Sequence, residues 1–290
     1  MDDALAWAAD NGAAPVGEVT QPRTALWSTA LRIPTSDGVV WLKVNGPGTS
    51  YEAGLVRALV AMGAPHLLTP LALDVDRGWL LLPDGGPTMR SVLDRDPDPA
   101  HWERVLPKYA ALQRATEKRV LPGVPDHRPR LMPAVLSQLL ETLPVERREE
   151  IEALQPRFAQ WCDELATSGI EPTVNHDDLH DNNVFSSDVL FDWGDADLAF
   201  PFTSLLVSLR SAKARWPELD LKRLRDAYLE PWTDTHSRAE LDLLALFATR
   251  VGKVGRSQAW VRALTGVPDA GEHSEAAPAW LEELLEEDVF

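Results

Sequence analysis

Residues 174–201 constrain the fold and the chemistry of this chain more than any other stretch. They read VNHDDLHDNNVFSSDVLFDWGDADLAFP, so acidic and amide side chains surround two short apolar runs. The runs at 184–186 and 189–191 predict two strands joined by a two-residue turn at Ser187 and Asp188. Because hard cations prefer oxygen ligands, we expect the ends of this segment to hold a metal ion and a catalytic carboxylate.

The predicted hairpin brings two oxygen-bearing side chains together. In its register Asn183 faces Asp192, and directly opposed residues have Cβ atoms about 4.5–5.5 Å apart. An amide oxygen and a carboxylate at that separation can share one Mg²⁺ ion. Asp178 precedes Asn183 in the loop that enters the hairpin, so we expect it close to the metal without having to be a ligand. The alternative is a polar loop whose Asx side chains satisfy backbone groups.

A different metal site is also compatible with the segment. His176, Asp178 and His180 alternate along the chain, which in an extended strand would place them on one side. Histidine and carboxylate ligands suit a transition metal, so a metal-dependent hydrolase is an alternative function. Against it, no second histidine pair or glutamate-rich partner motif for such a metal site stands out elsewhere in the sequence.

Composition narrows the range of partners. Lys and Arg number 28 against 45 Asp and Glu, a net charge of −17. Such a field repels nucleic acids and anionic lipids and favours cationic small molecules, although acidity that serves only solubility is an alternative. The single cysteine, Cys162, indicates a reducing compartment. With no secretion signal and no long apolar stretch, the sequence predicts a cytoplasmic protein, either a monomer or a homodimer.

The order of elements predicts an α+β protein with two lobes. β-branched and aromatic runs predict strands at 16–19, 25–33, 39–44, 67–75 and 78–82, with a helix at 50–62 between the third and fourth. The break at 83–87 is followed by helical periodicity, including separate helices at 237–254 and 257–265. We therefore expect a small β-rich lobe at residues 1–84 and a larger helical lobe at 85–290.

Two motifs within residues 174–201 resemble those of a known family. Residues 176–184, HDDLHDNNV, and 191–196, FDWGDA, resemble the H-G-D-L-H-x-G-N and I-D-W-x-x-A motifs of the aminoglycoside phosphotransferase and choline kinase-like family. The matching positions are His176, Asp178, Leu179, His180, Asn183, Asp192, Trp193 and Ala196. The resemblance implies a bilobal protein kinase-like fold, in which the small lobe binds the nucleotide and the large lobe carries catalysis and substrate binding.

The resemblance also implies roles for individual residues. Asp178 would act as the base or orienter of a substrate hydroxyl, and Asn183 and Asp192 would hold Mg²⁺ on the phosphates of ATP. The chain departs from the family where Asp177 and Asn182 replace glycines, although Asp and Asn tolerate left-handed backbone. The family's G-D-P-x-x-D-L reads AFPFTSL at 199–205 and loses both acids, so we expect the departure to affect the local anchoring of the chain more than the chemistry.

On the nucleotide side, Lys43 ends an otherwise apolar strand and Glu52 lies in the first turn of the next helix. In kinases a strand lysine contacts phosphates and pairs with a helix glutamate, although each residue alone has an ordinary structural explanation. The stretch 80–86, LLLPDGG, resembles the family's hinge; Pro83 lacks an N–H, so Leu82 and Asp84 are the expected adenine contacts. The turn expected at 21–24 contains no glycine to cover the phosphates closely.

The sequence thus predicts an ATP- and Mg²⁺-dependent phosphotransferase. The acceptor would be a hydroxyl of a small molecule of the aminoglycoside, amino sugar or amino alcohol type. Carboxylates and tryptophan suit a cationic or sugar-like ligand, so Asp195 and Trp260 are candidate acceptor contacts. Alternatives are a non-catalytic ATP-binding protein of the same fold and the hydrolase based on His176, Asp178 and His180.

Overall fold

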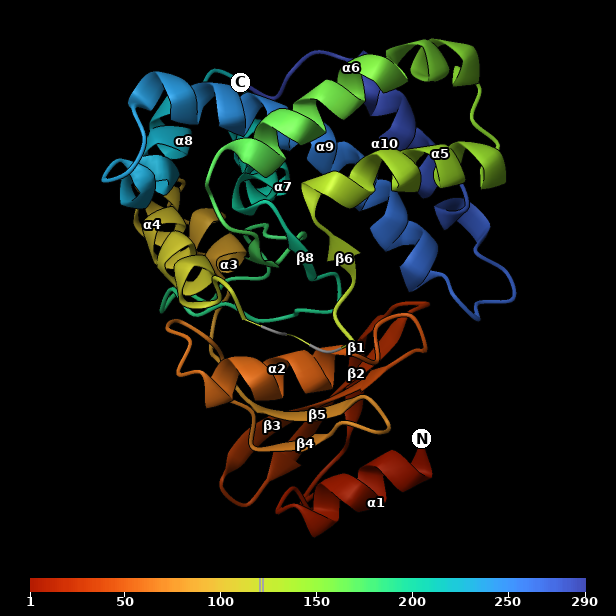
Figure 1. Ribbon diagram of the computed structural model, residues 1–290. Helices are drawn as coiled ribbons and strands as arrows, with labels where there is room; N and C mark the ends of the chain where they lie inside the picture. Colours follow the sequence, from red (N-terminus) through yellow and green to blue (C-terminus); the bar gives the residue numbers. More distant parts are fainter. Residues whose placement is uncertain (120, 122) are drawn as a thin grey trace.

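A five-stranded antiparallel sheet occupies the N-terminal end of the computed structural model (Figure 1). Its strand order is β1-β2-β3-β5-β4. The elements of this part are α1 (Asp2–Asp10), β1 (Thr20–Thr24), β2 (Ser28–Thr35), β3 (Gly38–Asn45), α2 (Glu52–Ala61), β4 (Ala72–Asp74) and β5 (Trp79–Pro83). The structure describes residues 1–119, 121 and 123–290, with the side chain of Thr24 excepted.

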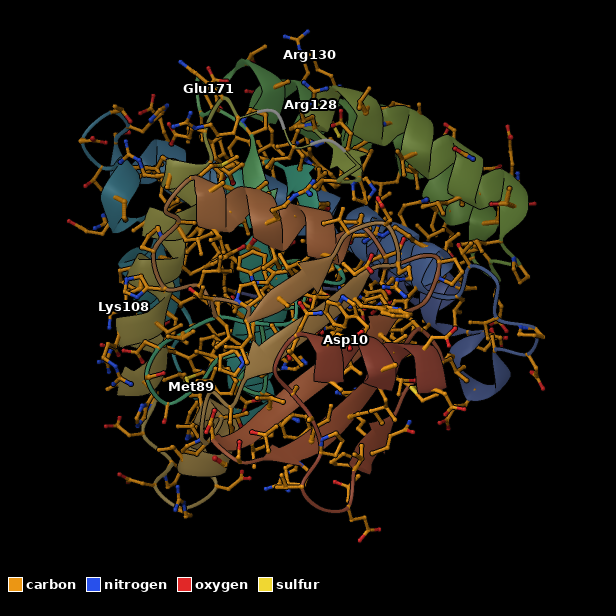
Figure 2. The ribbon with its side chains drawn as sticks, turned by 90° about the horizontal axis from the view of Figure 1, so that it is seen from below. Asp10, Met89, Lys108, Arg128, Arg130 and Glu171 are labelled. Atoms are coloured by element: carbon orange, nitrogen blue, oxygen red, sulfur yellow. The ribbon has the colours of Figure 1, made fainter. Side chains whose placement is uncertain are left out.

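Two helices cover opposite faces of this sheet (Figure 1). Successive strand residues point to opposite faces, so neighbours in one strand serve different cores. Leu42 and Leu81, which pair across β3 and β5, pack with the alanines of α1, whose last residue, Asp10, is labelled in Figure 2. Leu80 packs on the other face, with α2 and the rest of the chain. Lys43 pairs with Leu80, so its side chain lies on the face that meets the helical part.

The predicted position of the first strand is wrong. Residues 16–19 are not a strand, whereas the expected turn at 21–24 lies within β1, so the connection to β2 falls at 25–27. Pro22 favoured a turn because proline cannot donate a ladder hydrogen bond. β1 is an edge strand with an irregular register between Thr20 and Arg23, and there a missing N–H is tolerated.

The helical part follows β5 and makes up the rest of the chain (Figure 1). Its main elements are α3 (Met89–Leu93), α4 (Ala100–Ala115), β6 (Asp126–His127), α5 (Met132–Thr142), α6 (Arg148–Thr167), β7 (Thr173–Asn175), β8 (Asp197–Ala199), α7 (Leu205–Arg215), α8 (Lys222–Leu229), α9 (Arg238–Ala263) and α10 (Ala276–Glu282). The mixed α+β character expected from the sequence is therefore confirmed. In the described part of the chain, no helix has both the length and the apolar character needed to cross a bilayer.

α9 is one helix of 26 residues where the sequence predicted two. It begins with a capping box, in which the Ser237 side chain accepts from the Glu240 N–H and the Glu240 side chain accepts from the Ser237 N–H. The glycines near its middle favoured a break. Gly252 instead allows close packing, because a Cβ there would lie 3.3 Å from the Cβ of Thr203.

A second, three-stranded sheet was not predicted. Its order is β6-β8-β7, with β6 parallel and β7 antiparallel to β8. Asn175, at the end of β7, pairs with Asp197, at the start of β8. The polar stretch between these two strands, residues 176–196, is therefore a loop whose two ends are held side by side, and we call it the polar loop. Strands of two or three residues are too short to show a period of two in the sequence.

The polar loop also contacts the part of the chain that contains the five-stranded sheet. The Leu190 N–H donates to the carbonyl oxygen of His66, and the Leu68 N–H donates to that of Leu190. One hydrophobic core runs through both parts and contains Leu80 of β5, the buried face of α2 and Trp193. The arrangement of the two parts is thus set by burial as well as by the chain connection between them.

Gly48 offers a test of this packing. A Cβ at Gly48 would lie 1.8 Å from the carbonyl oxygen of Arg262 in α9, so Gly48→Ala must push the loop before α2 away from the helix. We expect the free energy of unfolding to fall by about 1–3 kcal/mol. The measurement is chemical denaturation followed by circular dichroism.

The matched control is Gly54→Ala, where the new methyl group would meet only the Val75 side chain at 3.5 Å. Because Gly54 lies inside α2, alanine should be neutral or stabilise by up to about 1 kcal/mol. Equal stability of Gly48→Ala and the wild-type protein would contradict the close approach of the loop and α9.

Candidate active site

The start of the polar loop is held by a buried network of hydroxyl and amide groups. The Asn175 amide nitrogen donates to the Thr203 hydroxyl at 2.6 Å and to the carbonyl oxygen of Phe200 at 2.9 Å. The His176 N–H donates to the Tyr109 hydroxyl, which is 2.7 Å from the Ser204 hydroxyl. Ser204 therefore takes part in the anchoring at a position where the resembled family has an acid.

The backbone conformation explains one departure from the family motif and not the other. Asp177 has a φ of 57° and Asp192 a φ of 64°, both in the left-handed region. Glycine is favoured in this region, and aspartate is among the residues that tolerate it. Asn182 is not among the residues with positive φ, so a glycine is not needed there.

The predicted hairpin register is wrong by one residue. Val184 pairs with Leu190, and the Phe191 N–H donates to the carbonyl oxygen of Asn183. The turn therefore has three residues, 186–188, and ends with Asp188 at a φ of 63°. Asn183 lies opposite Phe191, and Asp192 is the next residue along. A left-handed residue that closes a three-residue turn is usually glycine. Because aspartate stands at this position, the sequence did not indicate the three-residue turn.

The geometry does not favour the transition-metal alternative. His176 is buried against Trp193, with ring centroids 4.7 Å apart, and its Nε2–H donates to the carbonyl oxygen of Phe191 at 2.8 Å. Burial lowers the pKa of His176, so the ring is neutral near pH 7. Among the described residues, no group of three or more histidine, cysteine or carboxylate side chains could hold a metal ion.

Asp178 is a partly exposed carboxylate of the loop. Its side chain is 28% exposed, whereas the side chain of Asp177 is buried. One oxygen accepts from the Asn183 amide and faces His180 Nε2 at 3.4 Å. The other accepts from Arg256 at 3.3 Å. Burial alone would raise the pKa of Asp178, but Arg256 and His180 outweigh it and lower the pKa, so the carboxylate is ionised near neutral pH.

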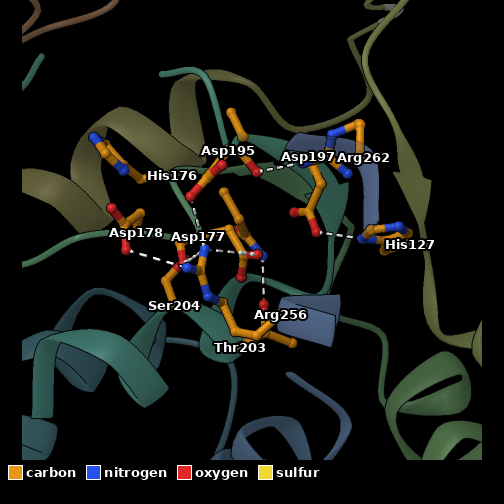
Figure 3. Close-up of polar contacts among 12 residues, drawn as sticks. His127, His176, Asp177, Asp178, Asp195, Asp197, Thr203, Ser204, Arg256 and Arg262 are labelled. Atoms are coloured by element: carbon orange, nitrogen blue, oxygen red, sulfur yellow. Dashed lines mark hydrogen bonds and ion pairs between the residues drawn. The ribbon is translucent and has the colours of Figure 1, made fainter. Parts of the chain in front are cut away.

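Arg256 is a site residue that the sequence analysis missed. This buried guanidinium of α9 donates to the carbonyl oxygen of Asp177 at 2.8 Å and to the carboxylate of Asp195 at 3.0 Å, in addition to Asp178 (Figure 3). It contacts three aspartates of the loop, and its contact with Asp178 leaves that carboxylate beside a fixed cation. In the sequence, Arg256 stands among small and apolar residues of a helix, which is an unusual place for a charged side chain and could have marked it. Its partners lie about 60–80 positions earlier in the chain, so the sequence does not show what it contacts.

Lys43, Glu52 and Asp192 form one connected group. The Lys43 ammonium lies 2.6 Å from the Glu52 carboxylate and 2.5 Å from that of Asp192. The ion pair expected between Lys43 and Glu52 is therefore present. Glu52 is buried, and it also accepts from the Trp193 N–H and the Asn45 amide. Burial would lower the pKa of Lys43, but the two carboxylates outweigh it and raise that pKa above its ordinary value.

The expected hinge is an extended stretch that ends in a turn. Leu82 pairs with Trp41 near the end of β5. Beyond it, the Asp84 carboxylate accepts from the Gly86 N–H and holds the turn. The backbone N–H and carbonyl of Asp84 have no hydrogen-bond partner within the described residues, so both groups are available to a ligand.

The two expected acceptor contacts lie apart from the pocket beside Asp178. That pocket has a volume of about 560 Å³, and its walls come from α3, α7, α9, α10 and the polar loop. Asp195 does not line it and instead pairs with Arg256. Trp260 stacks on His273 and meets Trp27 edge-on, away from these walls.

Several solved structures are similar to this protein in fold. A choline/ethanolamine kinase family protein from Mesorhizobium loti is 13% identical with a TM-score of 0.67, and the match covers 99% of this chain and 95% of that one. The choline kinase LicA from Streptococcus pneumoniae has the same identity and TM-score, with 98% of each chain covered. An aminoglycoside phosphotransferase from Streptomyces rimosus, solved with ADP and streptomycin, is 16% identical with a TM-score of 0.55, over 87% of this chain and 99% of that one.

These similarities confirm the bilobal, protein kinase-like α+β fold expected from the motifs. No curated protein is significantly similar in sequence. A family model described as the phosphotransferase enzyme family matches residues 42–241, a span that includes Lys43, Glu52 and the whole polar loop. This chain therefore belongs to the phosphotransferase enzyme family and is a small-molecule kinase.

Proposed function

We propose that this protein transfers the γ-phosphate of ATP to a hydroxyl group of a small molecule, with Asp178 binding that hydroxyl. The observation that carries the proposal is the position of Asp178. Its ionised carboxylate lines the 560 Å³ pocket and is linked through Asn183 to the loop that leads to Asp192. An acceptor in the pocket would thus meet Asp178 on the side where the nucleotide phosphates are expected.

On the nucleotide side, we assign Lys43 to the phosphates and Leu82 and Asp84 to the adenine. The Lys43 side chain is held by Glu52 on the sheet face toward the helical part, which suits a phosphate contact. The free N–H and carbonyl of Asp84 suit the edge of a flat base. The connection at 25–27, which includes no glycine, would lie over the phosphates in place of the loop expected at 21–24.

The side chains present fit a magnesium ion. The Asn183 amide oxygen accepts no hydrogen bond from the described residues, and the second carboxylate oxygen of Asp192 is also without a donor there. Both are the hard oxygen donors that Mg²⁺ prefers. When bound, the ion would neutralise charge on the nucleotide phosphates. Lys43 holds the other oxygen of Asp192 and so orients that carboxylate.

Asp178 would accept a hydrogen bond from the acceptor hydroxyl and aim its oxygen at the γ-phosphate. Its lowered pKa makes it a weak base, which suits a loose transition state in which the hydroxyl proton leaves late. His180 and Asn183 restrict the carboxylate from the other side. These groups are all provided by one loop and α9, so the hydroxyl is positioned before phosphoryl transfer begins.

The expected acceptor classes are aminoglycosides, amino sugars and amino alcohols, and the pocket beside Asp178 has a volume of about 560 Å³. A kinase of this kind would work in the cytoplasm, where ATP is available. The rival function on the same fold is an ATP-binding protein without transfer activity, and a metal-dependent hydrolase has no supporting geometry in the described residues.

Replacing Asp178 tests the proposed chemistry. Asp178→Ala should lower acceptor-dependent ADP release by roughly 10²–10⁴-fold, because the hydroxyl loses its orienting carboxylate. ATP affinity, measured by isothermal titration calorimetry, should change little. Turnover that survives the substitution would remove Asp178 from the mechanism, and a wild-type protein that binds ATP without transferring phosphate to any acceptor would favour the binding-protein alternative.

Replacing Asp192 tests the metal assignment through binding. The wild-type protein should bind ATP more tightly with Mg²⁺ than with EDTA, and Asp192→Asn should lose most of that difference because a charged oxygen ligand becomes a neutral amide. Calorimetric titrations with and without the metal give both affinities. Asp188→Asn is the control, since Asp188 instead pairs with Arg104 and Lys108 of α4. A Mg²⁺ effect that persists in Asp192→Asn would contradict the assignment.

A further inference from the structure

The pocket beside Asp178 differs in charge from the molecule as a whole. The chain carries a net charge of −17, yet four arginines and two aspartates are the formally charged residues among the walls. The arginines come from three helices: Arg90 from α3, Arg210 and Arg215 from α7, and Arg256 from α9. Basic side chains gathered from separate elements around one cavity indicate a binding site for negative charge.

The two aspartates leave little negative charge facing the cavity. Asp181 is only 6% exposed at its side chain, and it is neutralised by Arg90 at 2.7 Å and Arg215 at 3.1 Å. Asp178 is bound by Arg256. A cationic acceptor would therefore meet guanidinium groups and no free carboxylate other than the one that we assign to its hydroxyl.

Three of the arginines keep donors for a ligand. The side chains of Arg90, Arg210 and Arg215 are between 23% and 46% exposed. Their partners outside the cavity walls, Glu283 for Arg210 and Asp94 for Arg215, occupy only the Nη atoms. Within the described residues, the Nε–H groups of Arg210 and Arg215 have no acceptor.

Trp280 holds Arg210 in place. The Arg210 guanidinium lies 4.6 Å from the centre of the Trp280 ring, and both residues line the cavity. Stacking on an aromatic ring and a two-oxygen contact with Glu283 restrict the orientation of the guanidinium plane. A fixed guanidinium group is better suited than a mobile lysine to bind a carboxylate or a phosphate.

We propose that the phosphate acceptor carries an oxyanion, a carboxylate or a phosphate, in addition to its hydroxyl, and that Arg210 and Arg215 bind this anion while Asp178 binds the hydroxyl. The inference rests on the proposed phosphotransferase function, because it names the substrate class of that site. It replaces the cationic acceptor that the overall acidity favoured. The arginines offset the repulsion that an anionic acceptor would feel from the protein and from the nucleotide phosphates.

The experiment is a test of ADP release with matched compounds that differ in charge. Gluconate and glucose 6-phosphate are each compared with glucose, glycerate with glycerol, and ethanolamine, choline and streptomycin form the cationic arm. We expect turnover with an anionic member and little with its neutral partner. Faster ADP release with the carboxylate compounds or with the phosphate compound shows which of the two anions the protein prefers. Turnover confined to neutral or cationic compounds overturns the inference and leaves the phosphotransferase function standing.

Substitutions of single arginines test whether the anion binds in this pocket. Arg210→Gln should raise KM for the anionic acceptor by roughly tenfold to a hundredfold, the range expected for a lost hydrogen bond to a charged group, and far more than it raises KM for ATP. Arg210→Lys should recover only part of the loss, because the charge returns without the planar fork. Arg223→Gln is the control; this exposed arginine pairs with Glu103 outside the cavity walls. Equal effects of Arg210→Gln and Arg223→Gln would contradict an anion site in this pocket.

A binding measurement separates this inference from the proposed function. Inorganic phosphate should raise the melting temperature of the wild-type protein and of Arg223→Gln, and Arg210→Gln should lose much of that shift. This result would support the anion site even if the protein bound no ATP, an outcome that would refute the phosphotransferase function alone. An identical shift in Arg210→Gln and Arg223→Gln would refute the anion site.

Discussion

The buried carboxylate of Glu52 is the interaction on which the arrangement of this active site depends. Its two oxygens accept from the Trp193 N–H at 2.8 Å and from the Asn45 amide at 2.9 Å, and the ammonium of Lys43 lies 2.6 Å away. Burial raises the pKa of Glu52, and Lys43 opposes that effect. A buried charge at Glu52 would be costly without its hydrogen-bond and ion-pair partners. The sheet, α2 and the loop around Asp192 must therefore come together before Glu52 and its partners can all form these contacts.

Arg256 has the corresponding position in the helical part. It contacts Asp177, Asp178 and Asp195, and so connects α9 to the two ends of the polar loop. Burial and the nearby Asp197 raise the pKa of Asp177 well above its usual range, whereas Arg256 opposes this rise. The two neighbouring aspartates thus differ in environment. Asp177 is enclosed and supports the loop, while Asp178 keeps an exposed, ionised edge that lines the cavity.

Local and overall charge have different consequences in this molecule. The net charge of −17 describes the field far from the surface, where it repels nucleic acids and favours cations. At the cavity beside Asp178, four arginines face two aspartates among the walls, and Asp181, which Arg90 and Arg215 share, is almost fully buried. Short-range contacts outweigh a screened long-range field at a binding site, so the net charge of the chain does not by itself decide the charge of the acceptor.

The sequence by itself indicated the enzyme family, through the resemblance of its two motifs to known ones, together with the α+β class and the polar loop with Asp178, Asn183 and Asp192, because these depend on residue types at short spacings. It also indicated the contact between Lys43 and Glu52, since a lysine at the end of an apolar strand requires a partner. Only the tertiary structure decided the hairpin register, which depended on a left-handed aspartate that ordinary turn rules do not reveal. Only the tertiary structure brought Arg90, Arg210, Arg215 and Arg256 around one cavity, because residues on α3, α7 and α9 become neighbours through helix packing, and no local pattern records it.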